Sequence, residues 1–154
     1  MAKLRETILA EQNFIYSGYL QNLSRVAPTL AAAPHALQRE LIVGMLKSLL
    51  DVLGTGKDQA ARQWAAEWLA RPSANVQESL AALDLVARLA RGKVAAADVQ
   101  DAERLLHNLD KFDAGLALVR RALVEAEFQQ SRRLEWLVDA TSDWACLLAE
   151  DGSV

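Results

Sequence analysis

The chain has two histidines, the side chains best suited to acid–base chemistry and metal binding near neutral pH. His35 follows Pro34 at the start of an expected helix, which favours a capping or surface position over a ligand. His107 lies in a segment whose charged residues recur at helical spacing, so we expect it on a solvated polar face. These charged neighbours are Glu103, Arg104, Asp110 and Lys111. Neither histidine is therefore predicted to be a ligand.

No other residue pattern predicts catalysis. The single cysteine, Cys146, has no second cysteine for an internal disulfide, and a zinc site needs more Cys and His than the chain contains. Cys146 lies in an apolar run without a cationic neighbour, which favours an inert buried thiol over a redox sensor. Glu125 and Glu127 point to different faces of a helix and form no carboxylate pair. Without a phosphate-binding loop or a nucleophile elbow, the sequence predicts a non-enzymatic protein with no metal or cofactor.

Aromatic residues offer the best candidate for a binding site. Trp64 and Trp68 stand one helical turn apart, and together with Phe14 they form a predicted pocket for a small apolar ligand. Tyr16 or Tyr19 would complete its wall. The alternative is that these large side chains simply fill the core.

Composition places these residues in an all-α protein. Apolar residues make up 52% of the 154 and charged residues 24%, as in ordinary globular domains with one sizeable core. Only seven glycines and three prolines interrupt the helical periodicity. The net charge is −3 without a dominant Lys/Arg cluster, which disfavours nucleic acid as a partner. No signal-peptide core and no stretch approaching the roughly 20 apolar residues of a spanning helix is present, so we expect no membrane partner and a cytoplasmic location.

Helical spacing of apolar residues, punctuated by proline and glycine, predicts five helices. They cover residues 3–25, 35–53, 58–70, 76–92 and a last segment that begins near residue 95. The last segment contains an uninterrupted heptad seam, which continues to Ala126, and the fourth helix carries a second seam. Such a pair of helices either packs in the core of one domain or completes a four-helix bundle with a second copy. The second reading predicts a homodimer whose interface contains Leu80, Leu83, Leu105, Leu109, Phe112, Leu116, Val119 and Leu123.

The character of the chain changes after about residue 130. Gln130 and Arg133 occupy the next two seam positions, which predicts a helix that leaves its bundle as a linker. The apolar run over 143–149 predicts a strand, and Asp151-Gly152 a hairpin turn. We therefore expect one domain over 1–130 and the truncated start of another over 131–154, with the natural protein continuing further.

Residues 134–154, which read LEWLVDATSDWACLLAEDGSV, resemble the opening of a PAS domain. In that context the segment order of residues 1–130 resembles the N-terminal sensor domains of stressosome RsbR-type proteins, the non-haem globins. The segments that carry this resemblance are LIVGMLKSLL over 41–50 and AARQWAAEW over 60–68, followed by two long amphipathic helices. The resemblance implies a globin-like helical bundle that dimerises through its last two long helices.

Haem-binding relatives of such domains hold iron with a histidine on the short helix before the last two. Here that helix, 58–70, contains no histidine, and Trp68 or Trp64 stands in its place. An indole nitrogen is only a donor and does not ligate iron. We therefore expect a non-enzymatic sensory and dimerisation domain that signals through its last helix, near Gln130 and Arg133, to PAS and output domains. A haem-binding gas sensor and a ligand-free protein–protein adaptor are the alternatives.

Overall fold

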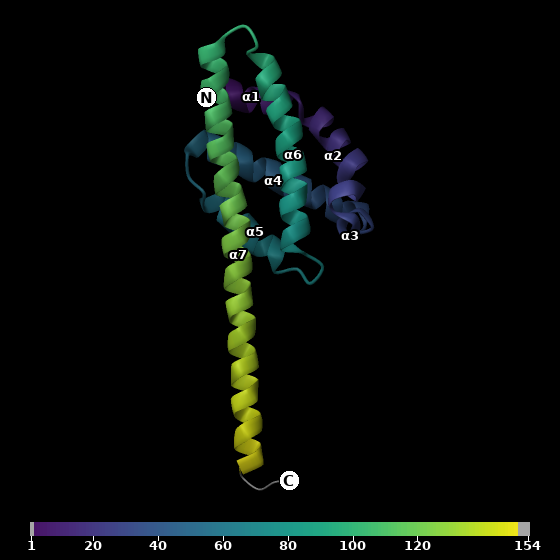
Figure 1. The fold of residues 1–154 in the computed structure, drawn as a ribbon, viewed down its shortest axis with the longest axis vertical. Coiled ribbons are helices and arrows are strands. Elements are labelled where there is room, and N and C mark those ends of the chain that lie inside the picture. Colours follow the sequence, from purple (N-terminus) through teal and green to yellow (C-terminus); the bar gives the residue numbers. More distant parts are fainter. Residues whose placement is uncertain (1, 151–154) are drawn as a thin grey trace.

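A computed structural model describes the backbone of residues 2–150 and the side chains of residues 4–133. This part of the chain forms seven helices and no strand, which confirms the predicted all-α helical bundle (Figure 1). The helices are α1 (Ala2–Ala10), α2 (Gln12–Val26), α3 (Pro28–Ala31), α4 (His35–Thr55), α5 (Gln59–Leu69), α6 (Val76–Ala97) and α7 (Ala102–Glu150).

Helix boundaries differ from the prediction at three places. The single helix expected over 3–25 is interrupted at Glu11, where neither glycine nor proline marks the break. The connection between the first two predicted helices contains the short α3. The fourth helix runs past Gly92 to Ala97, and the last helix begins at Ala102 instead of near residue 95.

The predicted strand over 143–149 is wrong, because the backbone there is the continuation of α7. Between Gly115 and Gly152 the sequence contains no glycine or proline, so nothing stops a helix once it has formed. A short apolar run fits a strand and a helix equally well, and the flanking alanines and leucines favour the helix. The Asp151-Gly152 turn lies outside the described residues.

Helices α6 and α7 run antiparallel, and α6 lies between α7 on one side and α2 on the other (Figure 1). Helices α4 and α5 pack against α7 as well, so the first part of α7 has one face on the body and another in solvent. The remainder of α7 continues well beyond the other helices (Figure 1). The core is one continuous cluster to which every helix contributes, α3 through Leu30.

Local signals fix the ends of the helices that build the body. Gly56 ends α4 in the left-handed conformation with φ of 72°, which glycine adopts without steric cost. Asn75 caps α6, since its side-chain oxygen accepts the backbone N–H of Glu78 at 3.1 Å. Asp101 caps α7 in the same way, accepting the N–H of Arg104 at 3.1 Å.

A buried amide joins α3 to α4. The Nε2 group of Gln38 donates to the carbonyl oxygens of Leu30, Ala31 and Ala33 at 3.1, 2.9 and 3.0 Å. In turn the hydroxyl of Tyr19, on α2, donates to the backbone carbonyl of Gln38 at 3.1 Å. Buried polar groups of this kind are stable only when paired, so the cluster fixes the corner where α2, α3 and α4 meet.

Candidate functional site

The most specific contact between α4 and α5 is made by Trp64 and Gly44. A Cβ atom placed on Gly44 would overlap Nε1 of Trp64 and would lie 2.6 Å from its Cδ1. The indole therefore rests on the backbone of α4, and only glycine leaves room for it. Trp64 stays half-buried, so its ring forms part of the molecular surface as well as part of the contact.

Trp68 has a different environment from Trp64. It is buried, and its Nε1 donates to Oγ of Ser79 on α6 at 2.9 Å. The Ser79 hydroxyl donates onward to the backbone carbonyl of Asn75 at 2.7 Å. Trp68 therefore fills the core and ties α5 to the first turn of α6, with its polar atom satisfied.

Two shallow grooves flank Trp64 between α4 and α5. One, of about 240 Å³, ends where the Arg71 guanidinium pairs with Glu40 and lies 5.6 Å from the centre of the Trp68 ring. The other runs past Asp51 toward the start of α5. Both grooves share Lys47, which has no ion-pair partner among the described side chains. The site is thus lined by charged groups around Trp64 and the edge of the buried Trp68, a more polar surface than the sequence predicted.

Phe14 does not belong to this site, so the predicted trio of Phe14, Trp64 and Trp68 does not come together. Phe14 lies on α2, is 47% exposed, and carries Nζ of Lys93 at 4.1 Å from its ring centre. It lines a separate groove between α2 and α6. Because α2 packs on α6 and α5 packs on α7, these aromatics occupy different sides of the body.

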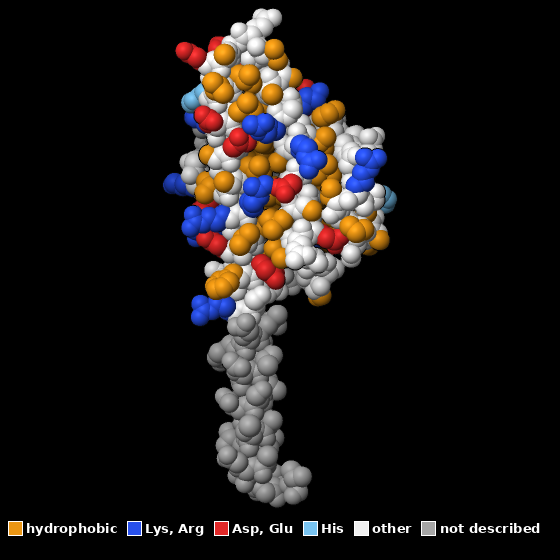
Figure 2. Space-filling model, in the orientation of Figure 1, with side chains coloured by type: hydrophobic (Ala, Val, Ile, Leu, Met, Phe, Trp, Pro, Cys, Tyr) orange, Lys and Arg blue, Asp and Glu red, His pale blue; other side chains and the backbone are white. Residues whose placement is uncertain are grey.

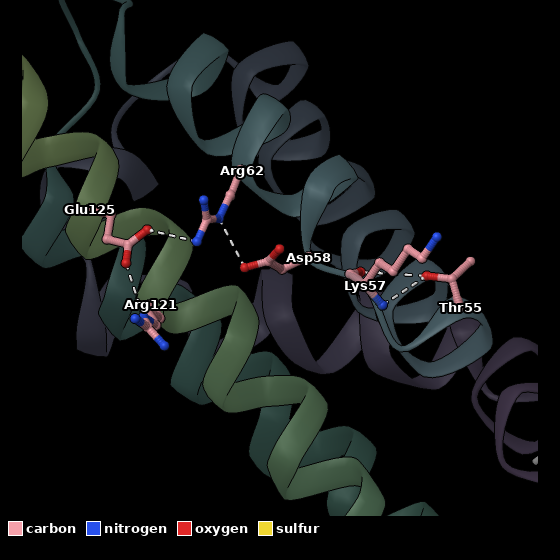
Figure 3. A network of polar contacts seen from close by, with 6 residues as sticks. All are labelled: Thr55, Lys57, Asp58, Arg62, Arg121 and Glu125. Atoms are coloured by element: carbon pink, nitrogen blue, oxygen red, sulfur yellow. Dashed lines mark hydrogen bonds and ion pairs between the residues drawn. The ribbon is translucent and has the colours of Figure 1, made fainter.

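A chain of ion pairs connects the start of α5 to α7 near the point where α7 leaves the body (Figure 3). Nε of Arg62 lies 2.9 Å from Oδ2 of Asp58, and its Nη2 lies 3.6 Å from Oε2 of Glu125. Glu125 also accepts from Nε of Arg121 at 3.0 Å. All these side chains are at least 30% exposed, so each pair contributes at most about 1 kcal/mol. Their importance lies in position: they join α5 to α7 by contacts that are easily rearranged.

Five of the eight residues predicted for a dimer interface are buried inside this chain. Leu83, Phe112, Leu116, Val119 and Leu123 are at most 9% exposed, because the seams of α6 and α7 pack against each other and against α2, α4 and α5. A helix inside a globular bundle and a helix in a coiled coil share the same apolar spacing. The other three predicted residues are half-buried: Leu80, Leu105 and Leu109.

The exposed apolar residues of α7 lie on its opposite face. Leu106 is 62% exposed, Val124 50% and Phe128 61%. Figure 2 shows the side of the molecule on which α6 and α7 lie, with hydrophobic side chains scattered between basic and acidic ones. These residues lie outside the heptad seam, so apolar periodicity did not identify them.

The two histidines are exposed, His35 at the first turn of α4 and His107 on α7. The side-chain positions described contain no group of three or more His, Cys, Asp or Glu arranged to hold a metal. Cys146 lies in the part of α7 whose side chains are not described. None of the described helices is both long and apolar enough to span a membrane.

We compared the chain with protein-family models, with curated proteins and with solved structures, and none of these comparisons gives a match.

Proposed function

We propose that this chain is a non-enzymatic, dimeric input module that passes a conformational signal along α7 to a following PAS-like region. One observation carries the proposal: α7 is a core helix of the body and also its projecting helix, without an interruption. Its first half is packed by α4, α5 and α6, and its helical backbone continues to Glu150. A displacement of the body helices therefore reaches the projecting part through one rigid element.

The α4–α5 contact is the place where an input would act. The indole of Trp64 lies directly on Gly44, so anything that inserts beside Trp64 must push α5 away from α4. Helix α5 packs extensively on α7, and small residues form its inner face, Ala61 and Ala65 among them. Close-packed helices transmit such a push because the interface has no spare volume to absorb it.

The junction through Arg62 and Glu125 supports the same route. It connects the first turn of α5 to α7 only a few residues before Gln130, where the heptad seam ends. Exposed ion pairs are weak and exchange partners easily. A small movement of α5 would therefore change how Glu125 is shared between Arg62 and Arg121, and would tilt or shift α7 at its exit.

Hydrogen exchange of the variant Gly44→Ala tests the relay. The added methyl group mimics an insertion beside Trp64, and overpacking of this kind costs about 1–3 kcal/mol. We expect amide exchange about tenfold faster in α5 and in the stretch of α7 around residues 119–133, since tenfold corresponds to about 1.4 kcal/mol of local opening.

Gly54→Ala is the matched control, because it lies in the same helix and its Cβ would meet only the flexible end of Arg5, at 3.2 Å. Its exchange pattern should stay that of the unmodified chain. If Gly44→Ala accelerates exchange in α4 and α5 while α7 keeps its protection, the body does not communicate with α7 and the relay is wrong.

A further inference from the structure

We propose that the dimer forms when the groove between α2 and α6 of one copy receives the first turns of α7 of the other, with a two-fold axis parallel to α7. This inference rests on the dimerisation that forms part of the proposed function, and it names the two surfaces that meet. Both surfaces lie within the described residues, and each is complementary to the other in charge.

The receiving surface is a groove of about 330 Å³ whose walls are apolar and whose charges are all basic. Phe14 forms one wall, and Leu89 and Ala96 of α6 form the other, with Gly92 leaving an open floor. Its two charged residues are Arg88 and Lys93. Lys93 covers the Phe14 ring and lies 3.6 Å from Glu11, whereas Arg88 has no ion-pair partner among the described side chains.

The surface that docks lies on the first turns of α7. Glu103, Leu106 and Asp110 are three and four residues apart, so they share one face of the helix. All three are exposed, and neither Glu103 nor Asp110 has an ion-pair partner among the described side chains. An exposed leucine between two free carboxylates complements a basic groove with an exposed phenylalanine. A groove of this form recognises an amphipathic helix.

The register of α6 and α7 places the two surfaces at about the same position along the helix axes. Arg120 pairs with Asp84, and Arg91 lies 3.2 Å from Asp113. Each residue further along α6 therefore lies beside a residue one position earlier in α7. Continued two residues further along α6, this register puts Lys93 within about one helical turn of Asp110 along the axis.

A two-fold axis parallel to α7 keeps this common position along the helix axes, so the groove of one copy can contact α7 of the other. Helix α6 separates α7 from α2 in the body (Figure 1). A two-fold axis that is parallel to α7 and passes in front of α6 turns the second copy to face the first. The α7 helix of the second copy then lies opposite α2 of the first copy. Its position along the axis is unchanged. Each copy then supplies one groove and one acidic face, as an isologous dimer requires.

The same axis leaves both copies of α7 running in the same direction, so their projecting parts emerge side by side. That arrangement gives the relay two parallel helices whose separation changes when the bodies move. A chain of net charge −3 would otherwise repel its own copy, and the local basic groove overcomes this repulsion at the contact.

Charge exchange between the two surfaces tests the proposal by sedimentation velocity over a dilution series. Lys93→Glu and Asp110→Lys should each weaken dimer formation about tenfold, because each reversed contact occurs twice in the dimer. A chain carrying both substitutions restores opposite charges at both contacts and should recover the affinity to within about threefold. Raising the salt concentration should weaken the unmodified dimer and leave the two single variants less affected.

Three further variants separate the interface from folding. Leu106→Ala removes an exposed anchor and should weaken the dimer without lowering the unfolding free energy of the dilute monomer, whereas Val43→Ala, 42% exposed on α4, should change neither. Arg39→Glu, exposed on α4, is the charge-reversal control. Because Lys93 also contacts Glu11, Arg88→Glu replaces Lys93→Glu if that variant is unfolded by circular dichroism.

The outcomes distinguish the interface from the proposed function. A dimer that is indifferent to Lys93→Glu, Asp110→Lys and Leu106→Ala overturns the interface and leaves a dimeric input module in place. Single variants that dissociate but are not rescued by combining them also overturn it. A chain that remains monomeric at all concentrations removes both the interface and the dimer, while the hydrogen-exchange test of the relay within one body is unaffected.

Discussion

Replacing Gln38 tests whether one buried amide holds the corner between α3 and α4. The side chain is 5% exposed, and its Nε2 group is the donor for the carbonyls of Leu30, Ala31 and Ala33. In Gln38→Ala these carbonyls lose that donor. The Leu30 carbonyl keeps the backbone N–H of Ala33 at 3.0 Å, whereas the partly buried carbonyls of Ala31 and Ala33 have no other described donor.

The expected cost follows from those three bonds. An ordinary hydrogen bond contributes about 1 kcal/mol, and a buried carbonyl left unpaired costs about 1–3 kcal/mol. Two amide hydrogens serve three acceptors, and the Leu30 carbonyl retains the Ala33 N–H, so we expect Gln38→Ala to lower the unfolding free energy by about 2 kcal/mol. Urea denaturation followed by circular dichroism measures this, with Gln21→Ala, exposed on α2, as the control that should cost less than about 0.5 kcal/mol.

The substitution Gln38→Glu gives a sharper version of the same test. A carboxylate facing three carbonyl oxygens is repelled, whereas a protonated carboxyl donates one hydrogen bond, so the folded protein favours the protonated form. The pKa of the new carboxyl is therefore raised in the folded state. Stability relative to the unmodified chain is then highest below the ordinary carboxyl pKa of about 4.3 and falls as the pH rises through the raised value.

A loss for Gln38→Ala smaller than about 1 kcal/mol would refute this reasoning, because the carbonyls of Ala31 and Ala33 would then have found other partners at little cost. So would a Gln38→Glu variant whose deficit is the same at pH 7 and near pH 4, a range that spans the ordinary carboxyl titration.

Two further predictions concern Gly92 and Tyr19. A Cβ on Gly92 would meet no atom within 4 Å, so Gly92→Ala should raise the unfolding free energy of the monomer in urea by about 0.5–1 kcal/mol, and a decrease would contradict an open position there. Burial, with a smaller contribution from the neighbouring Tyr16, raises the pKa of the Tyr19 phenol above its ordinary value near 10. The unfolded chain releases this proton first, so stability should fall as the pH rises above about 10, and Tyr19→Phe should reduce that fall in alkaline urea titrations; an equal fall in both proteins would contradict it.

Apolar periodicity was sufficient to predict most helices and the all-α class, because burial selects the same spacing whatever the tertiary fold. The end of α4 at the left-handed Gly56 and the start of α6 at the Asn75 cap have a chemical cause, and both lie within about two residues of the predicted boundaries. The break at Glu11 has no such cause in the sequence. The chain changes direction between α1 and α2, and both helices pack against α6. The break is therefore determined by tertiary packing.

Site residues were harder to predict, since the contacts that define them join distant parts of the chain. The spacing of Trp64 and Trp68 predicted that both lie on one helix. Their different environments, with Trp64 half-buried and Trp68 buried, depend on contacts with Gly44 and Ser79. A glycine inside the apolar pattern of α4 was the one available signal for the Trp64 contact. Nothing in the sequence linked Arg62 to Glu125.

The burial of the heptad seam constrains how α7 can move. Phe112, Val119 and Leu123 are fully buried, and each contributes roughly 2 kcal/mol or more through apolar burial. Rotating α7 within its own body would expose such side chains, so the helix must move together with its neighbours as a rigid unit. The contacts that yield first are the exposed ion pairs around Glu125, worth at most about 1 kcal/mol each. A signal that reaches the projecting part of α7 is therefore a change in how two bodies are set against each other or in the tilt of α7 at its exit, and the core seam itself stays closed.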